Sequence, residues 1–434
     1  MYFWVFKQIK KPMTEDFLQY IWQHRLYLPE GNCTVEGDPV EPLQPGQANT
    51  HAGPDFTDAR VRIGDTLWAG CVEIHLRSSD WERHGHHTDP AYNNVVLHVV
   101  YQHDANAYNA RRQKIPVMEL HFDARYFDNY NRLVDSKARI ACHDEPCKLD
   151  EFSFVSWTER LAVERIEQKS EAIMQSNVST GNHWEETLYQ RLARNFGFSL
   201  NALPFESLAK SIPLNILLKH KDHLQQIEAL LFGQAGMLPD EQIADTYYTE
   251  LQKEYRYLQK KYNLEPIDRF LWKFLRLRPI NFPTLRIAQF AALIHRNEHL
   301  FSQIMEAKSV DIFENLFDLQ ASAYWDTHYT FGKESPIRKK TFGKSSIHTV
   351  LINTVAPFLF VYGKTRGKDD YCTRAVALLE SLPPEKNSIT ARWEKLGVRN
   401  PDAFTSQALL QLDNEYCRPK RCLSCAIGNK IVRN

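Results

Sequence analysis

Two acidic residues and a histidine in the first third of the chain have the spacing of a metal-dependent site. Asp55 follows a proline at a predicted turn. Glu73 and His75 lie two residues apart in an alternating segment, residues 70–77. Because a strand points alternate side chains to the same face, Glu73 and His75 share one face of that segment. Two carboxylates suit a hard cation such as Mg²⁺ or Mn²⁺, and the imidazole beside them suits a base or a further ligand.

This combination of groups predicts hydrolysis of a phosphodiester. A divalent ion activates water and stabilises the charge that develops on a phosphate. We expect Asp55 and Glu73 to bind the metal, and His75 to serve as general base or third ligand. Arg77 lies on the same strand face as Glu73 and His75 and is expected to bind the phosphate. The alternative is a turn and a half-exposed strand whose polar side chains have no chemical role.

A histidine-rich turn follows the same segment. Histidine is the commonest side-chain ligand of transition metals, and a carboxylate can complete such a site. We therefore expect His84, His86 and Asp89 at the rim of the metal site, with Zn²⁺ as an alternative occupant. The competing interpretation is a solvated loop whose histidines bond backbone groups. His98 lies in an apolar segment and is interpreted as a core histidine.

Three cysteines late in the sequence have the spacing of a metal knuckle. Cys417, Cys422 and Cys425 include one pair separated by two residues, which predicts a structural Zn²⁺ or an iron–sulfur cluster. The alternative is a set of unligated thiols. The local string resembles the cysteine loop of iron–sulfur DNA glycosylases of the endonuclease III type, which has a fourth cysteine after the third. None follows Cys425, so Cys372 would have to come from elsewhere in the fold.

The elements that position these residues fall into two regions. A helix is predicted over Met13 to Tyr27, and alternating or apolar segments between residues 59 and 122 predict a small sheet. From residue 152 onward the hydrophobic spacing is helical. We therefore predict an α+β protein. A small N-terminal mixed-sheet domain, residues 1–145, carries the candidate metal site, and a larger all-helical domain, residues 146–434, carries the cysteine cluster.

The composition limits the classes of partner that we expect for this chain. The 53 Lys and Arg residues balance 53 Asp and Glu residues, so nothing but a local basic patch would attract nucleic acid or an anionic membrane. No uninterrupted apolar run reaches membrane-spanning length. Eight cysteines in 434 residues do not predict a disulfide scaffold. We expect a cytoplasmic protein without a membrane partner, whose helical domain holds nucleic acid or another protein.

Two family resemblances accompany these patterns. Pro54-Asp55 and Glu73-Ile74-His75 resemble the PD-(D/E)xK phosphodiesterases, with Glu15 as an additional carboxylate and His75 in place of the usual lysine. This resemblance covers the first third of the chain and implies a divalent-metal-dependent nuclease. The segments Gly53–Phe56, Val72–His75, Tyr92–Val100, Leu192–Phe198 and Asn281–Gln289, together with the cysteine tail, are similar to a bacterial family of unknown function, DUF2851. This similarity extends from Met13 to the C-terminus and implies no activity. The rival hypothesis is a non-enzymatic helical scaffold whose N-terminal sheet is structural.

Overall fold

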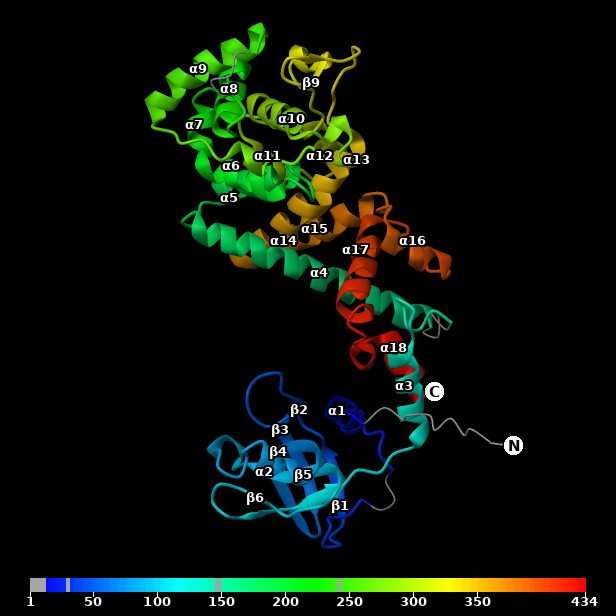
Figure 1. The fold of residues 1–434 in the computed structure, drawn as a ribbon. Coiled ribbons are helices and arrows are strands. Elements are labelled where there is room, and N and C mark those ends of the chain that lie inside the picture. Colours follow the sequence, from blue (N-terminus) through cyan, green and yellow to red (C-terminus); the bar gives the residue numbers. More distant parts are fainter. Residues whose placement is uncertain (1–12, 29–31, 145–149, 240–242) are drawn as a thin grey trace, which may run out of the picture. The chain divides into compact units, whose positions relative to one another are not determined.

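The computed structural model describes residues 13–28, 32–144, 150–239 and 243–434, and these fall into two units (Figure 1). Unit 1 comprises the chain up to Val155 together with Asp413–Asn434, and unit 2 comprises Ser156–Leu412. The predicted order, a small mixed sheet followed by a mostly helical region, is confirmed. The predicted boundary at residues 145–146 lies outside the described residues. The division falls instead within helix α4 (Glu151–Ser179).

A six-stranded mixed sheet forms the centre of unit 1. Its strands are β1 (Val40–Gln44), β2 (Gln47–Ala48), β3 (Phe56–Ile63), β4 (Thr66–Arg77), β5 (Val95–Gln102) and β8 (Val117–Glu119). The order is β1-β3-β4-β5-β8, with β2 paired to β3. The β1–β3 and β3–β4 pairs are antiparallel, whereas β5 runs parallel to both β4 and β8. Because β4 is central, residues 72–75 are buried without a break.

Two smaller elements of unit 1 complete the surroundings of β4. Helix α1 (Glu15–Gln23) packs against β4 and is capped by Thr14, whose hydroxyl accepts a hydrogen bond from the backbone N–H of Phe17. Its buried side chains are Phe17, Leu18, Tyr20, Ile21 and Trp22. A short hairpin of β6 (Ala107–Tyr108) and β7 (Lys114–Ile115) lies beyond β5 in the chain. The first residue of α1, Glu15, is thereby placed beside β4.

The last part of the chain belongs to unit 1, whereas the sequence predicts it as part of the helical domain. Helix α18 (Ala426–Arg433) packs against α3 (Ala124–Asp135). Tyr20 donates its hydroxyl hydrogen to Asn429 Oδ1 over 2.9 Å. The segment before α18 contains η6 (Leu412–Cys417) and η7 (Cys422–Ser424). Helical periodicity identifies a helix but not the core against which it packs. The sequence therefore places the last segment with the helices that precede it, whereas in the structure it packs in unit 1.

Unit 2 is built from helices, with one small addition. Besides most of α4, these are α5 (Trp184–Phe196), α6 (Ala202–Ser211), α7 (Leu214–Leu218), α8 (Leu224–Gln234), α9 (Thr246–Tyr262), α10 (Pro283–Arg296), α11 (Leu300–Glu306), α12 (Val310–Leu316), α13 (Lys344–Val350), α14 (Ala356–Arg366), α15 (Asp369–Ser381), α16 (Ser388–Lys395) and α17 (Ala403–Gln411). A two-stranded sheet of β9 (His328–Thr330) and β10 (Lys333–Glu334) departs from the all-helical prediction. It is a local hairpin too short to show an alternating pattern.

One helical run of unit 2 is apolar enough to resemble a membrane span. Lys344–Arg366 comprises α13, the π-helical turn η5 (Leu351–Val355) and α14. Among the helices that the structure describes, no other is long and apolar enough to cross a membrane. Its most apolar window is 72% buried inside the protein, as in the core helix of a soluble protein.

Candidate metal centre

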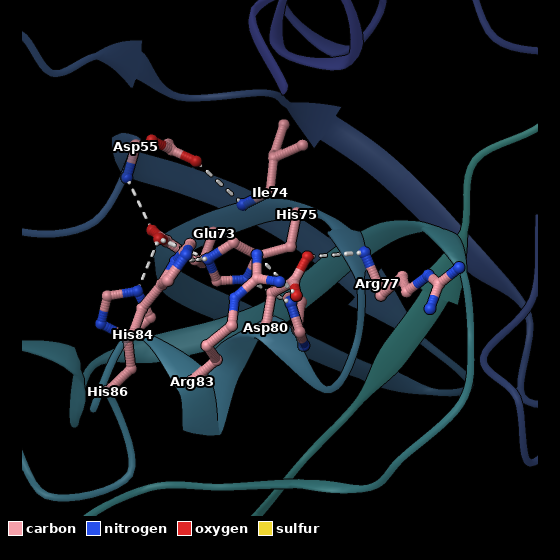
Figure 2. Close-up of polar contacts among 10 residues, drawn as sticks. Asp55, Glu73, Ile74, His75, Arg77, Asp80, Arg83, His84 and His86 are labelled. Carbon is pink, nitrogen blue, oxygen red and sulfur yellow. Dashed lines mark hydrogen bonds and ion pairs between the residues drawn. The ribbon is translucent and has the colours of Figure 1, made fainter. Parts of the chain in front are cut away.

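Three histidines from β4 and the turn after it come together in unit 1. His75 lies on β4, while His84 and His86 follow the short helix α2 (Asp80–Arg83). One ring nitrogen of each histidine lies within 4.8 Å of the others. Figure 2 shows the three side chains together with their neighbours. Across the described part of the chain, no other three His, Cys, Asp or Glu side chains meet this spacing. Metal–imidazole bonds are about 2.0–2.1 Å long, so small side-chain shifts would let one ion contact all three rings.

Buried groups hold the turn that carries two of these histidines. Asp80 is 3% exposed and accepts a hydrogen bond from the backbone N–H of Arg77 at 3.1 Å. Trp81 is fully buried and donates its indole N–H to the carbonyl of Tyr108 over 2.9 Å. A polar anchor and an apolar anchor therefore fix the beginning of the turn against the sheet.

A glycine reverses the chain between the two histidines of the turn. Gly85 has φ of +80°, a conformation that side chains with a Cβ rarely adopt. The rings on either side both reach the ring on β4. His84 Nδ1 lies 3.1 Å from His75 Nε2, and the rings of His86 and His75 stack with centroids 5.3 Å apart. His84 is exposed and His86 is buried, so the cluster opens to solvent on the His84 side.

Glu73 adds a carboxylate to the three imidazoles. Its Oε1 lies 3.5 Å from His75 Nε2 and 3.3 Å from His86 Nε2. Glu73 is 5% exposed and shares with His75 the face of β4 that meets the turn, as the alternation of the strand predicts. A donor set with more nitrogen than oxygen suits Zn²⁺ or Mn²⁺ better than Mg²⁺.

Asp55, the residue before β3, contacts Glu73 on the neighbouring strand β4. The backbone N–H of Asp55 donates to Glu73 Oε2 at 2.9 Å, and Asp55 Oδ2 accepts from the N–H of Ile74 at 3.0 Å. The Asp55 carboxylate is thus close to the cluster but turned toward the backbone of β4 (Figure 2). Burial, and then the charge of Glu73, raise the pKa of Asp55 to about 7. A carboxyl group with this pKa can exchange a proton near neutral pH.

His98 supports His75 from β5. It is fully buried, and its Nε2 lies 2.9 Å from His75 Nδ1. Burial, and then neighbouring imidazoles, lower the pKa of His75 to about 2 and that of His98 to about 3. Both rings are therefore neutral near pH 7, which is the form of histidine that binds metals. A hydrogen bond at Nδ1 of His75 fixes the ring with Nε2 facing the cluster, so His98 is a positioning residue as well as a core histidine.

Replacing His98 with phenylalanine tests this positioning role. Phenylalanine fills a similar volume but removes the hydrogen bond to His75 Nδ1. We expect the dissociation constant for Zn²⁺ or Mn²⁺ to rise by about 10–100-fold, measured by titration of metal-free protein, while the circular dichroism spectrum stays unchanged. His121→Phe, at an exposed position of unit 1, is the control and should bind metal like the wild type. Unchanged affinity in His98→Phe would contradict the role.

A third acidic side chain lies near the cluster, on α1. The Glu15 carboxylate lies near the backbone of Leu76 on β4 and near the side chains of His84, Asp80 and Glu73. Burial raises the pKa of Glu15, and the nearby His84 opposes this rise. The structure therefore places the additional carboxylate that the PD-(D/E)xK resemblance implies within the electrostatic reach of the histidine cluster.

Two neighbours of the cluster are absent from the sequence prediction. The ring of Tyr92 stacks on His86 with centroids 3.8 Å apart, and burial followed by the charge of Glu73 raises the pKa of Tyr92 to about 12. Arg83 pairs with Asp80 Oδ1 at 2.9 Å, and its side chain is 69% exposed. Arg83 lies inside the histidine-rich turn, which is a signal that could have identified it. Tyr92 has no comparable signal in the sequence.

Two predicted residues stand apart from the cluster. Arg77 is exposed, and its side chain extends away from the histidines (Figure 2). Asp89 is exposed and accepts a hydrogen bond from the N–H of Ala91 at 2.9 Å, which caps the 3₁₀ turn η1 (Pro90–Tyr92). The structure therefore brings neither side chain into the group of ligand atoms.

The predicted cysteine ligands also lie in unit 1, although they are far from the three histidines along the sequence. Cys417, Cys422 and Cys425 are 8%, 8% and 7% exposed, and none forms a disulfide. Cys372, the candidate fourth ligand, belongs to α15 in unit 2, where its Sγ contacts the carbonyl of Phe360 at 3.5 Å. Cys147 lies outside the described residues.

Comparison with known proteins gives one match. A family model described as a protein of unknown function (DUF2851) matches residues 15–388, a span that contains all the residues of the histidine cluster. The searches of curated proteins and of solved structures returned no match.

Proposed function

Because this chain belongs to the DUF2851 family, whose function is unknown, its role follows from the site itself, and we propose that unit 1 is a transition-metal-dependent phosphodiesterase. The observation that supports this most is the meeting of three imidazoles within 4.8 Å of one another, with Glu73 touching two of them. Ring nitrogens of three histidines beside the buried carboxylate of Glu73 form a donor set that favours binding of a cation.

The proposed ligands are His75, His84, His86 and Glu73. A bound Zn²⁺ or Mn²⁺ would supply a Lewis acid that lowers the pKa of water and polarises a phosphoryl oxygen. His84 is exposed, so a substrate would approach from its side of the cluster.

Asp55 is the candidate for the general base, a role for which its carboxyl group would rotate from the Ile74 N–H toward the cluster. Its pKa of about 7 lets it accept a proton from water at neutral pH, whereas the pKa of His75, about 2, makes that ring a weak base. This proposal therefore differs from the sequence prediction in the role of Asp55, and of the two roles predicted for His75 it keeps that of a ligand. Asp55 would handle the proton, and His75 would be a ligand held by His98.

Arg83 takes the place that the sequence prediction gives to Arg77. Its guanidinium is fixed at one nitrogen by Asp80 and is close enough to His75 to lower the pKa of that ring. With much of its side chain exposed, Arg83 can bind an anionic phosphate at the open side of the cluster. The charge and position of this residue support a phosphoester substrate over a neutral one.

Hydrolysis of bis(p-nitrophenyl) phosphate, and of single- and double-stranded DNA and RNA, tests the proposal. We expect metal-free protein to be inactive and to gain activity with Mn²⁺ or Zn²⁺ more than with Mg²⁺. Glu73→Gln keeps an acceptor for the Asp55 N–H but removes a ligand charge, and should lose activity by about 100-fold or more. Glu82→Gln, an exposed position in the same turn, is the matched control.

Metal binding without hydrolysis of any of these substrates would overturn the proposed activity. Equal activity in Glu73→Gln and wild type would show that any hydrolysis observed comes from elsewhere. Either result would favour the scaffold hypothesis, in which the metal has a structural role.

A further inference from the structure

We infer that Cys142 completes a four-thiolate metal centre with Cys417, Cys422 and Cys425. Sequence spacing leaves this set one ligand short. The fold brings a cysteine from the region after α3 to the three cysteines of the chain end, all within unit 1. The centre is independent of the histidine cluster and of the activity proposed for it.

The four thiols share one buried environment. All are free, the three late cysteines are more than nine-tenths buried, and Cys142 is half-buried. Burial, and then the neighbouring Cys425 and Cys422, raise the pKa of Cys142 to about 12. Burial, followed by Cys425 and Cys142, likewise raises the pKa of Cys417. Each thiol is therefore close enough to feel the charge of the others, and a metal cation would reverse this repulsion.

Two charged side chains hold the region before Cys142 against the cysteine loop. Lys420 Nζ donates to the backbone carbonyls of Ser136 at 2.9 Å and Ala138 at 2.8 Å. Arg139 Nη2 lies 2.6 Å from Oδ2 of Asp413, a carboxylate with no exposed surface. These contacts fix the backbone on both sides of the proposed centre, as a preformed metal site requires.

Cys425 lies at the N-terminus of α18. It is the N-cap residue of this helix, and its sulfur forms no side-chain cap hydrogen bond. The partial positive charge of the helix N-terminus favours the thiolate, the form of cysteine that binds metals. A Cβ at Gly428 would lie 2.2 Å from the carbonyl oxygen of Cys422, so glycine is needed for the helix to approach the loop this closely.

The spacing of the sulfurs favours an iron–sulfur cluster over a single ion. Considering the described cysteines alone, no three thiols lie within 4.8 Å of one another. One Zn²⁺ with four bonds of about 2.3 Å would draw the sulfurs to about 3.8 Å from each other. A [4Fe–4S] cluster spreads its four cysteine ligands over four separate irons and so accepts a wider set. Binding of either would release the four thiol protons.

Metal analysis of the full-length protein, purified without oxygen, tests the inference. We expect four irons and four acid-labile sulfides per chain, with a broad visible absorption that bleaches on reduction. Cys142→Ser should lose more than about nine-tenths of this iron. Cys372→Ser, in unit 2, is the matched control and should keep it. Equal iron in Cys142→Ser and wild type, or a wild type without iron or thiol-bound zinc, would overturn the inference.

Zinc is distinguished from a cluster in the same experiment. One zinc per chain that is lost in Cys142→Ser but kept in His86→Ala would support the four-thiolate centre and overturn the cluster as its occupant. If Cys142→Ser is insoluble, X-ray absorption at the metal edge of the wild type decides. Coordination by sulfur alone supports the inference, and a nitrogen or oxygen ligand in place of the fourth cysteine sulfur overturns it.

Discussion

Replacing His86 with alanine is expected to raise the dissociation constant of Zn²⁺ or Mn²⁺ at the histidine cluster by more than about 100-fold. This loss corresponds to about 2.8 kcal/mol of binding free energy. The reason is that His86 contributes one of only three imidazoles and also contacts Glu73 at 3.3 Å. Isothermal titration of metal-free protein measures the change directly, and the wild type should bind one ion at this site.

The next residue provides the control for this substitution. His87 lies in the same turn, is exposed, and is outside the group of three ligand nitrogens. His87→Ala should bind metal with wild-type affinity. Equal weakening by both substitutions would mean that the effect comes from the turn as a whole, and no weakening by His86→Ala would exclude that ring as a ligand.

Replacing Asp55 with asparagine is expected to stabilise the metal-free protein at pH 8 by roughly 2–4 kcal/mol, with little effect at pH 4. Burial and the charge of Glu73 raise the pKa of Asp55 to about 7 in the folded protein, against 3.8 ordinarily. Between these pH values the folded state binds the proton more tightly than the unfolded state does. The free energy of unfolding therefore falls as pH rises from about 4 to 7, and asparagine, which cannot ionise, avoids this loss.

Urea denaturation of the two metal-free proteins at pH 4, 6 and 8 measures the difference. Asparagine can still accept the hydrogen bond from the Ile74 N–H, so the backbone contact is retained. Asp65→Asn, at an exposed turn, is the control and should show no pH-dependent gain. A stability difference that is the same at all three pH values would contradict the raised pKa.

Much of the neighbourhood of the candidate site could be predicted because it is local in sequence. Alternation along a strand is enough to place Glu73 and His75 on one face, and the histidine-rich turn follows the same strand directly. The composition of that turn predicts that His84 and His86 lie near the site. The structure brings both rings to His75, and the metal they are proposed to bind stays a prediction.

The sequence could not predict the orientation of individual side chains or the contacts between residues far apart in the chain. Arg77 shares a strand face with Glu73 in the alternating pattern, yet it lies at the end of β4, where its side chain extends to solvent. Arg83, which pairs with Asp80, lies near the cluster instead. The contact between His98 and His75 depends on the pairing of β4 with β5, which no local pattern specifies.

The cysteines illustrate the same limit at longer range. Their spacing predicts a metal knuckle, but it does not say which domain core the last helix joins or which thiol is fourth. Packing of α18 against α3 places the chain end in unit 1, and Lys420 joins it to the segment that precedes Cys142, the proposed fourth ligand. A helical period carries information on a helix's buried face and none on its partner.

A crystal of the whole chain, soaked in Mn²⁺ and measured for anomalous scattering, tests the proposed metal centre directly. We expect one peak in unit 1 within bonding distance, about 2.0–2.3 Å, of ring nitrogens of His75, His84 and His86 and of a Glu73 oxygen. A manganese-saturated crystal with no peak among these four side chains, and with the imidazoles still hydrogen-bonded to one another, would contradict it.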